Sequence, residues 1–177
     1  MKLKITQILL GSLLVLSTLV GACSSQTSNE GFAIYLTKDN VPPSQMEALS
    51  HVNLADQPII SLNDIIHYDW ATHEIELTSA AYQKLDEMHF PTNGTSFLVC
   101  VDRQPVYWGA FWPSYSSQSF DGVTIVTSPF LHESEGASNT IQISLGYPGS
   151  SFHQGVDPRS NQQIMDALVK AGKLVSA

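Results

Sequence analysis

The 177-residue chain is short of positive charge, and this shortage excludes several kinds of partner. It has 8 lysines and arginines against 16 aspartates and glutamates, which gives a net charge of −8. Nucleic acids and anionic lipid head groups attract proteins through clustered lysine and arginine, and this chain has no such cluster. We therefore expect no nucleic-acid partner.

Cysteine and catalytic motifs are equally scarce. The chain has two cysteines, Cys23 and Cys100. It lacks the Gly-x-Ser-x-Gly pattern of serine hydrolases and the His-Glu-x-x-His pattern of zinc peptidases. Histidines and acids do lie near one another at His67–His73, but a hydrogen-bonded, partly buried imidazole is the ordinary role of a histidine on a strand. We predict no catalytic residue, no metal and no cofactor.

The N-terminus has the features of a secretion signal. The start is basic at Lys2 and Lys4, the stretch Ile8 to Val20 is apolar, and small residues precede Cys23. A basic start, an apolar core of about ten residues and small residues before the cleavage point are typical of a signal peptide. The apolar core is too short for a transmembrane helix, which takes about 20 residues.

Because Cys23 follows Gly21 and Ala22, this segment resembles a bacterial lipoprotein signal. The resemblance implies cleavage before Cys23, a diacylglyceryl group on its thiol, and a protein held outside the cytoplasm on a bacterial cell membrane. An ordinary secretory signal with an incidental cysteine is the alternative. Each buried methylene of an acyl chain contributes about 0.8 kcal/mol, so a multiply acylated Cys23 would hold the chain firmly on a bilayer.

The chain then divides into three segments. Residues 1–22 form the signal peptide, 23–31 a lipidated polar linker, and 32–177 a single domain. Cleavage removes two lysines and no acids, which leaves 6 basic and 16 acidic residues and a charge of −10. With Cys23 lipidated, Cys100 has no disulfide partner, so the core alone must stabilise the fold. Cys100 is expected to be a small buried residue.

The apolar residues are densest at 97–112, where two runs flank the polar turn Asp102 to Pro105. Both runs are rich in β-branched and aromatic residues and lack polar alternation, which predicts a central hairpin covered on both faces. Further strands are predicted at 32–36, 73–77, 123–126 and 140–145, helices at 79–88 (capped by Thr78) and from Asp157, and single helical turns near Ser44 and Ser61. The fold class is α+β, with a mostly antiparallel sheet of about five to six strands and two or three helices.

Several short patterns resemble the large extracytoplasmic domain of the SecD protein-export subunit. They are Pro58–Ile65, Ile75–Ala81, Leu98–Pro105 and Gly172–Leu174. The chain departs from that family at Arg103, where a turn glycine is expected, and in the absence of transmembrane helices, which excludes a translocase motor. Most of the family's later glycine-rich segment is also missing, and 128–157 looks inserted. The resemblance implies a fold and a module that holds other chains, and it implies no catalytic residue.

The serine-rich segment after the hairpin carries the candidate binding surface, which consists of Trp112, Tyr115 and Phe120. Tryptophan and tyrosine beside adaptable hydroxyl groups are typical of surfaces that recognise peptides or sugars. Trp108 is assigned to the core because it shares a strand face with Val106. For Trp112 and Tyr115, packing at the edge of the core is the alternative.

Two functions follow from these features. The first is a lipid-anchored cell-envelope protein without catalytic activity, which acts as a binding or assembly module for a protein or peptide. The alternative is an envelope hydrolase whose site draws on His67, Asp69, His73 or the loop 150–157. An inhibitor or immunity-type partner is a third role that the sequence does not separate from the first. A hydrolase requires a concave pocket in which at least two of those side chains converge.

Overall fold

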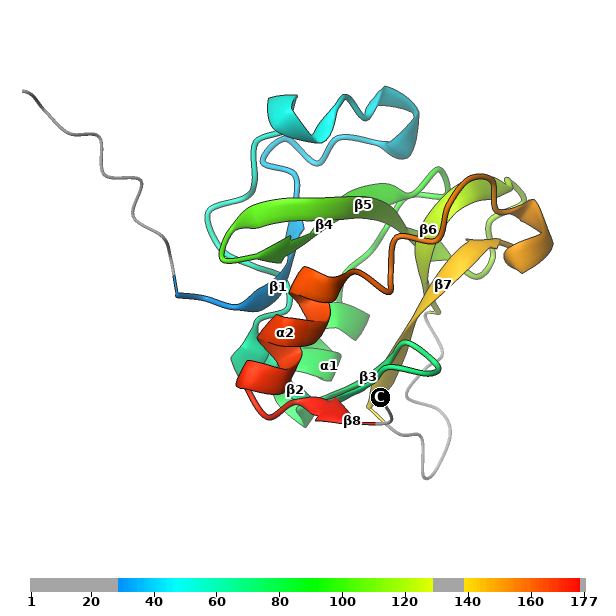
Figure 1. Cartoon of the computed structure of the whole chain (residues 1–177). Coiled ribbons are helices and arrows are strands. Elements are labelled where there is room, and N and C mark those ends of the chain that lie inside the picture. Colours follow the sequence, from blue (N-terminus) through cyan, green and yellow to red (C-terminus); the bar gives the residue numbers. More distant parts are fainter. Residues whose placement is uncertain (1–28, 129–138, 176–177) are drawn as a thin grey trace, which may run out of the picture.

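Eight strands and two α-helices make up the described part of the chain, residues 29–128 and 139–175 of a computed structural model (Figure 1). The strands form one sheet in the order β1–β4–β5–β6–β7–β3–β2–β8. They are β1 (Phe32–Leu36), β2 (Ile65–Asp69), β3 (Glu74–Leu77), β4 (Thr95–Val101), β5 (Gln104–Pro113), β6 (Phe120–Thr127), β7 (Thr140–Tyr147) and β8 (Leu174–Val175). The helices are α1 (Ser79–Asp86) and α2 (Gln162–Lys170), and short 3-10 turns occur at η1 (Pro43–Gln45), η2 (Leu49–His51), η3 (Leu62–Asp64) and η5 (Ser150–Phe152). The predicted α+β class is confirmed.

The hairpin β4–β5 lies inside the sheet, as its apolar sequence predicts. Its strands pair antiparallel from Thr95 with Phe111 to Val101 with Gln104. The turn is two residues long, and both Asp102 (φ 50°) and Arg103 (φ 63°) adopt the left-handed backbone conformation. Arg103 thus keeps the backbone geometry for which glycine is usually required.

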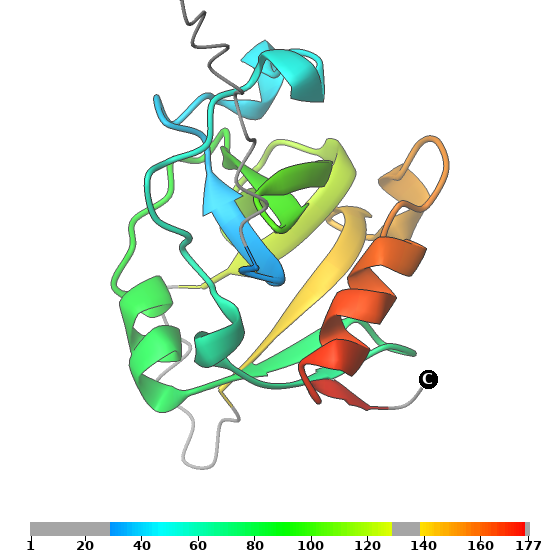
Figure 2. The ribbon, with the colours of Figure 1, turned by 60° about the vertical axis from the view of Figure 1, so that its left-hand side comes forward.

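Each face of the sheet is covered by a different layer (Figures 1 and 2). On one face α1 and α2 pack over the main core through Ala81, Tyr82, Leu85, Ile164, Ala167 and Leu168. On the other face the segment that contains η1 and η2 covers a smaller cluster around Tyr35, Leu98 and Cys100. This double cover explains why β4 is buried at alternate and intervening positions alike.

Both edges of the sheet are covered or short. The outer edge of β1 is bonded by the chain that follows η2, with Ile34 N donating to Ile60 O at 2.8 Å and Ala55 N to Leu36 O at 3.0 Å. At the opposite edge β8 has two residues and pairs parallel to β2. Within residues 29–128 and 139–175, neither edge presents a long row of free backbone groups.

Strands β6 and β7 diverge part of the way along their length. They pair antiparallel from Phe120 with Tyr147 to Ile125 with Ile143. Beyond that point β6 continues beside β5, whereas β7 pairs with β3 through Ile141 and Ile75. The two strands therefore form a fork. Residues of α1 lie at its opening, where they line one cavity together with β6 and β7.

The sheet has more strands than the five or six predicted. The prediction treated Ile65 and Ile66 as part of a helical turn, but the capping box between Ser61 and Asp64 closes only the single turn η3, and β2 follows it. The two-residue β8 carries no sequence pattern of its own.

The start of α2 also differs from the prediction. Its N-cap is Asn161, whose Oδ1 accepts a hydrogen bond from Gln163 N at 2.8 Å. Asp157, the predicted cap, instead binds Arg159. None of the helices within 29–128 and 139–175 is long and apolar enough to cross a membrane. The predicted signal peptide and Cys23 lie outside these residues.

Candidate functional site

The predicted binding residues Trp112 and Phe120 pack against each other. Their rings stack at 5.1 Å with an interplanar angle of 10°, and Trp112 is only 3% exposed. Its indole Nε1 donates to Gln118 O at 3.2 Å. Both rings therefore support the loop between β5 and β6, and Trp112 is not available on the surface. Trp108 packs against the small cluster under η2, which agrees with its assignment to the core.

Tyr115 has a different position from its two predicted companions. It is 61% exposed, and its hydroxyl donates to Phe90 O at 3.5 Å. Two further bonds fix the loop that carries it: Ser116 Oγ donates to Thr92 O at 2.6 Å, and Tyr147 Oη donates to Ser114 O at 2.7 Å. Tyr115 is thus an exposed aromatic ring on a loop held by hydrogen bonds.

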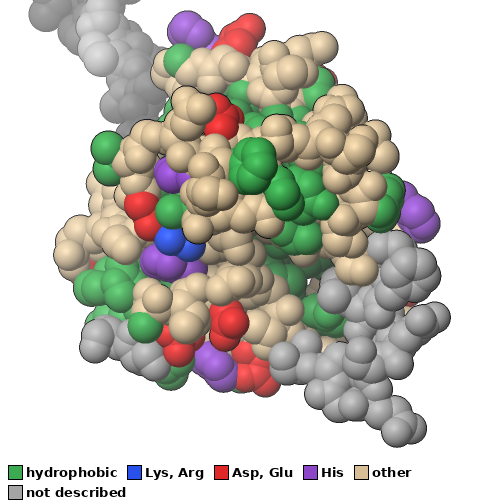
Figure 3. Space-filling view, turned by 90° about the vertical axis from the view of Figure 1, so that its right-hand side faces the viewer, with side chains coloured by type: hydrophobic (Ala, Val, Ile, Leu, Met, Phe, Trp, Pro, Cys, Tyr) green, Lys and Arg blue, Asp and Glu red, His purple; other side chains and the backbone are tan. Residues whose placement is uncertain are grey.

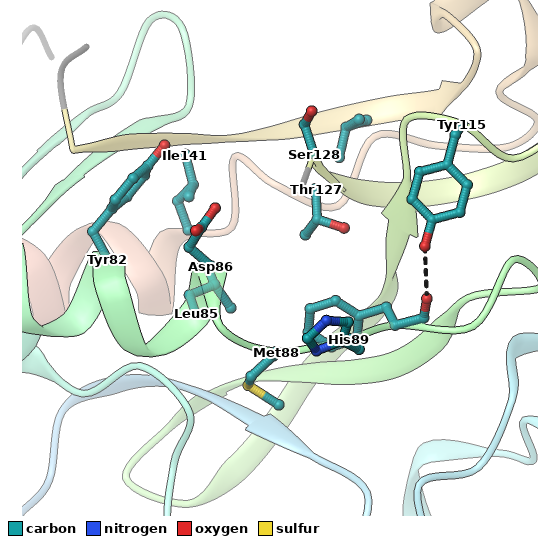
Figure 4. A pocket seen from close by; sticks show the side chains of 11 residues that line it. Tyr82, Leu85, Asp86, Met88, His89, Tyr115, Thr127, Ser128 and Ile141 are labelled. Atoms are coloured by element: carbon teal, nitrogen blue, oxygen red, sulfur yellow. Dashed lines mark hydrogen bonds between the residues drawn. The ribbon is translucent and has the colours of Figure 1, made fainter. Parts of the chain in front are cut away.

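The ring of Tyr115 lines a cavity of about 120 Å³ at the fork between β6 and β7, the fork cavity (Figure 4). Its lining residues are Tyr82, Leu85, Asp86, Met88, His89, Phe90, Tyr115, Val126, Thr127, Ser128 and Ile141. Helix α1 supplies one wall, since its N-cap Thr78 and its apolar stripe turn Tyr82 and Leu85 towards the sheet. β6 and β7 supply the other walls.

The fork cavity is mainly apolar, with polar groups at its border. In Figure 4 the side chains of Asp86, His89 and Thr127 surround the central space. Burial, together with the nearby Asp86 carboxylate, raises the pKa of Tyr82, so the phenol of Tyr82 is neutral at neutral pH. An apolar cavity of roughly 150 Å³ accommodates one benzene ring, so the fork cavity has the size for a single side chain.

The predicted hydrolase residues of β2 and β3 do not converge. His67 Nδ1 lies 3.0 Å from Glu76 Oε2, and both side chains are about 40% exposed on the outer face of the strands. Asp69 Oδ1 accepts the backbone N–H groups of Ala71 and Thr72. His73 is buried and shares a 2.9 Å hydrogen bond with the Tyr68 hydroxyl. His67 and His73 therefore bind different partners, and the charges of Asp69 and Asp157 act on His73.

The loop 150–157 does not assemble a triad either. His153 Nδ1 donates to the backbone carbonyl of Asp121 at 2.8 Å. The Asp157 carboxylate receives two hydrogen bonds from the guanidinium of Arg159, at 2.9 and 2.7 Å. Asp157 therefore positions the guanidinium of Arg159. Arg159 in turn donates to Ile143 O at 2.8 Å and holds the loop on β7.

The Cys100 thiol is buried in the sheet. Burial raises the pKa of the Cys100 thiol to about 12, so the thiolate is not populated at neutral pH. Within the described residues, His, Cys, Asp and Glu side chains form no group of three that could hold a metal ion.

Sequence reasoning identified Tyr115 but not the cavity beside it. Tyr82, Leu85 and Met88 belong to the helix predicted at 79–88, and Val126 and Ile141 belong to predicted strands. No local pattern shows that these elements meet, because the meeting depends on the change of partner that β7 makes at Ile143.

Compared with family models, curated proteins and solved structures, the chain matches none of them. The resemblance to the SecD domain therefore stays a prediction based on short sequence patterns.

Proposed function

We propose that this protein is a lipid-anchored binding module of the bacterial cell envelope, held by acyl chains on Cys23, and that it binds a protein or peptide partner at the fork cavity. The sequence supports the anchor through the signal before Cys23. The arrangement of side chains supports a binding role rather than a catalytic one, since His67, His73 and His153 each have a different structural partner.

The observation that carries this proposal is the position of Tyr115. Its ring is 61% exposed at the border of an apolar cavity, on a loop held by Ser116 and Tyr147. Binding surfaces concentrate their affinity in such rigid aromatic residues next to a pocket. The cavity would accept one apolar side chain of the partner, and Tyr115 would cover it.

Capped amino acids test this site directly. N-acetyl-phenylalanine amide and N-acetyl-leucine amide are titrated into isotope-labelled protein, with N-acetyl-glycine amide as the probe that lacks a side chain. We expect resonances of Tyr82, Met88 and Ile141 to shift with the first two probes only. The variant Tyr115→Ala should bind them several-fold more weakly.

Phe152→Ala is the matched control, because Phe152 is another exposed aromatic residue, 45% exposed, and does not line the fork cavity. It should bind the probes as the wild type does. Shifts that are the same for all three probes, or equal weakening in both variants, would contradict a binding role for the cavity.

A hydrolase is the second candidate, and one observation favours it. Asp86, His89 and Ser128 line the same cavity, and an acid, an imidazole and a hydroxyl are the groups of acyl-transfer sites. We rank it second because His89 is exposed to solvent, whereas a catalytic base is normally held by a buried acid. Hydrolysis of a p-nitrophenyl ester that Ser128→Ala abolishes and Phe152→Ala leaves intact would favour the enzyme.

A further inference from the structure

The chain enters the domain at a point that four contacts hold in place. Gly31 N donates to Asp102 Oδ1 at 2.7 Å, and Asp102 N donates to Gly31 O at 2.9 Å. Glu30 accepts a hydrogen bond from the Tyr35 hydroxyl, and Lys170 Nζ donates to Asn29 Oδ1 at 3.3 Å. The position at which Asn29 leaves the domain is therefore fixed relative to β1, the β4–β5 turn and α2.

A groove of about 380 Å³ lies at this entry point, between the chain and the outer side of α2. Leu62, Val101, Ala167 and Ala171 supply its apolar lining. Asn29, Gln163, Lys170, Asp102 and Asp166 supply its polar border, so one cation faces two acids. We call this region the entry face.

The fork cavity and the groove at the entry face share no lining residue. In Figure 1 the blue start of β1 and the yellow strand β7 are at opposite sides, and Figure 2 shows β1 in front and β7 behind it. Figure 3 shows the side opposite the entry, where hydrophobic side chains gather in the upper half and basic side chains are scarce.

The distance from Cys23 to Asn29 limits how the domain can stand on a membrane. Six residue steps separate them, and such a chain spans at most about 20 Å when fully extended. A domain of this size has a radius of gyration near 15 Å, and is thus roughly 40 Å across. An orientation with the entry face uppermost would place Asn29 about twice the available reach away from the bilayer.

We propose that the entry face, with Asn29, Gln163 and Lys170, rests against the lipid head groups, and that the fork cavity opens towards the side away from the membrane. This inference rests on the proposed lipid anchor at Cys23. The entry face is selected by the length of the tether and not by its charge, because Lys170 is balanced by Asp102 and Asp166. A partner would therefore approach the anchored protein from the aqueous side.

Energy transfer from a fluorophore on the protein to an acceptor on lipid head groups tests this orientation. The full chain is purified from membranes with its lipid and bound to phosphatidylcholine vesicles. A single label is introduced through Gln163→Cys on the entry face or Gln154→Cys in the loop after η5, and both replace an exposed glutamine. The acylated Cys23 and the buried Cys100 do not compete for the label.

We expect transfer to be several-fold stronger from position 163 than from position 154. The ratio should persist when a quarter of the lipid is replaced by anionic phosphatidylglycerol, because the tether sets the orientation. Equal transfer from both positions, or stronger transfer from 154, would overturn the orientation while leaving the anchor intact. Protein whose mass lacks acyl chains and which stays in the supernatant would overturn the anchor, and this inference with it.

Discussion

Among single residues, the buried His73 connects two strands with the loop before α2. It adopts a left-handed backbone conformation (φ 56°), and its side chain is 6% exposed beside Tyr68. Its carbonyl accepts from Ile143 N at 3.0 Å, and Ile143 O accepts from Arg159. A proton added to His73 would place a second positive charge near the Arg159 guanidinium.

Lowering the pH should therefore destabilise the folded protein through protonation of His73. Burial lowers the pKa of this imidazole, and the charge of Arg159 lowers it further, against the opposing effect of Asp157 and Asp69. An unfolded histidine titrates near about pH 6.5. Below that pH the unfolded chain binds a proton that the folded chain does not, so stability is complete above it and falls as the pH falls towards the folded pKa.

Urea unfolding at about pH 7.5 and about pH 5.5 measures this effect, with each unit of pKa shift corresponding to about 1.4 kcal/mol. We expect the wild type to lose more stability between the two conditions than His73→Asn, since asparagine tolerates the left-handed conformation and does not titrate. If the wild type and His73→Asn lost the same amount of stability between the two pH values, His73 would not be the cause of the pH dependence.

Among the elements, α2 offers a test of where a helix begins. The side chain of Asn161 accepts from Gln163 N at 2.8 Å and satisfies one of the free N–H groups of the first turn. Removing such a cap costs about 1 kcal/mol of stability. Asn161→Ala should therefore lower the free energy of unfolding by about that amount, whereas Asn161→Ser, which keeps a capping oxygen, should stay near the wild type. If Asn161→Ala and Asn161→Ser were equally stable, the side chain of Asn161 would not be the N-cap of α2.

The contact between β5 and β6 depends on a glycine. A Cβ atom on Gly109 would lie 2.5 Å from Phe97 Cζ and 2.6 Å from the backbone oxygen of Val123. The parallel partner strand cannot retreat without breaking its pairing, so Gly109→Ala should cost roughly 2–3 kcal/mol of stability.

Gly149→Ala is the control for this change, because a Cβ atom there meets no atom within 4 Å. Its thermal and urea midpoints should match the wild type. If Gly109→Ala unfolded at the same midpoint as Gly149→Ala, the close approach of the two strands would be refuted.

The elements that the sequence predicts best are those whose pattern is local. The hairpin β4–β5, the strand β1 and the capped helix α1 carry their signal in β-branched runs or in a stripe after Thr78. Strand β8 could not be predicted, because its two residues become a strand only through hydrogen bonds such as that from Tyr68 N to Lys173 O.

The candidate site was predictable to a similar extent. Tyr115 stands out in the sequence as an aromatic residue in a serine-rich loop, and it is exposed. Trp112 has the same local surroundings but lies on the buried side of β5, where it stacks on Phe120. Which aromatic ring faces the solvent depends on the path of the loop over β6, and sequence spacing does not contain that path.

For the molecule as a whole, Cys23 should decide where the protein is found. Acylation there would place the chain in the membrane fraction and release it with detergent, because each buried methylene contributes about 0.8 kcal/mol. Cys23→Ser should shift the protein to the soluble fraction. Cys100→Ala should leave it in the membrane fraction, since Cys100 is a buried residue of the sheet. Soluble wild-type protein would contradict the anchor.

The covered edges of the sheet affect whether neighbouring copies of the protein aggregate. Attachment to a membrane confines all copies of a protein to a thin layer and raises their local concentration, and exposed strand edges would then join neighbouring copies into aggregates. Here the chain after η2 bonds along β1, and β8 ends the other side after two residues. The fold is thus suited to the proposed anchor at Cys23: copies crowded on one membrane would not extend each other's sheets.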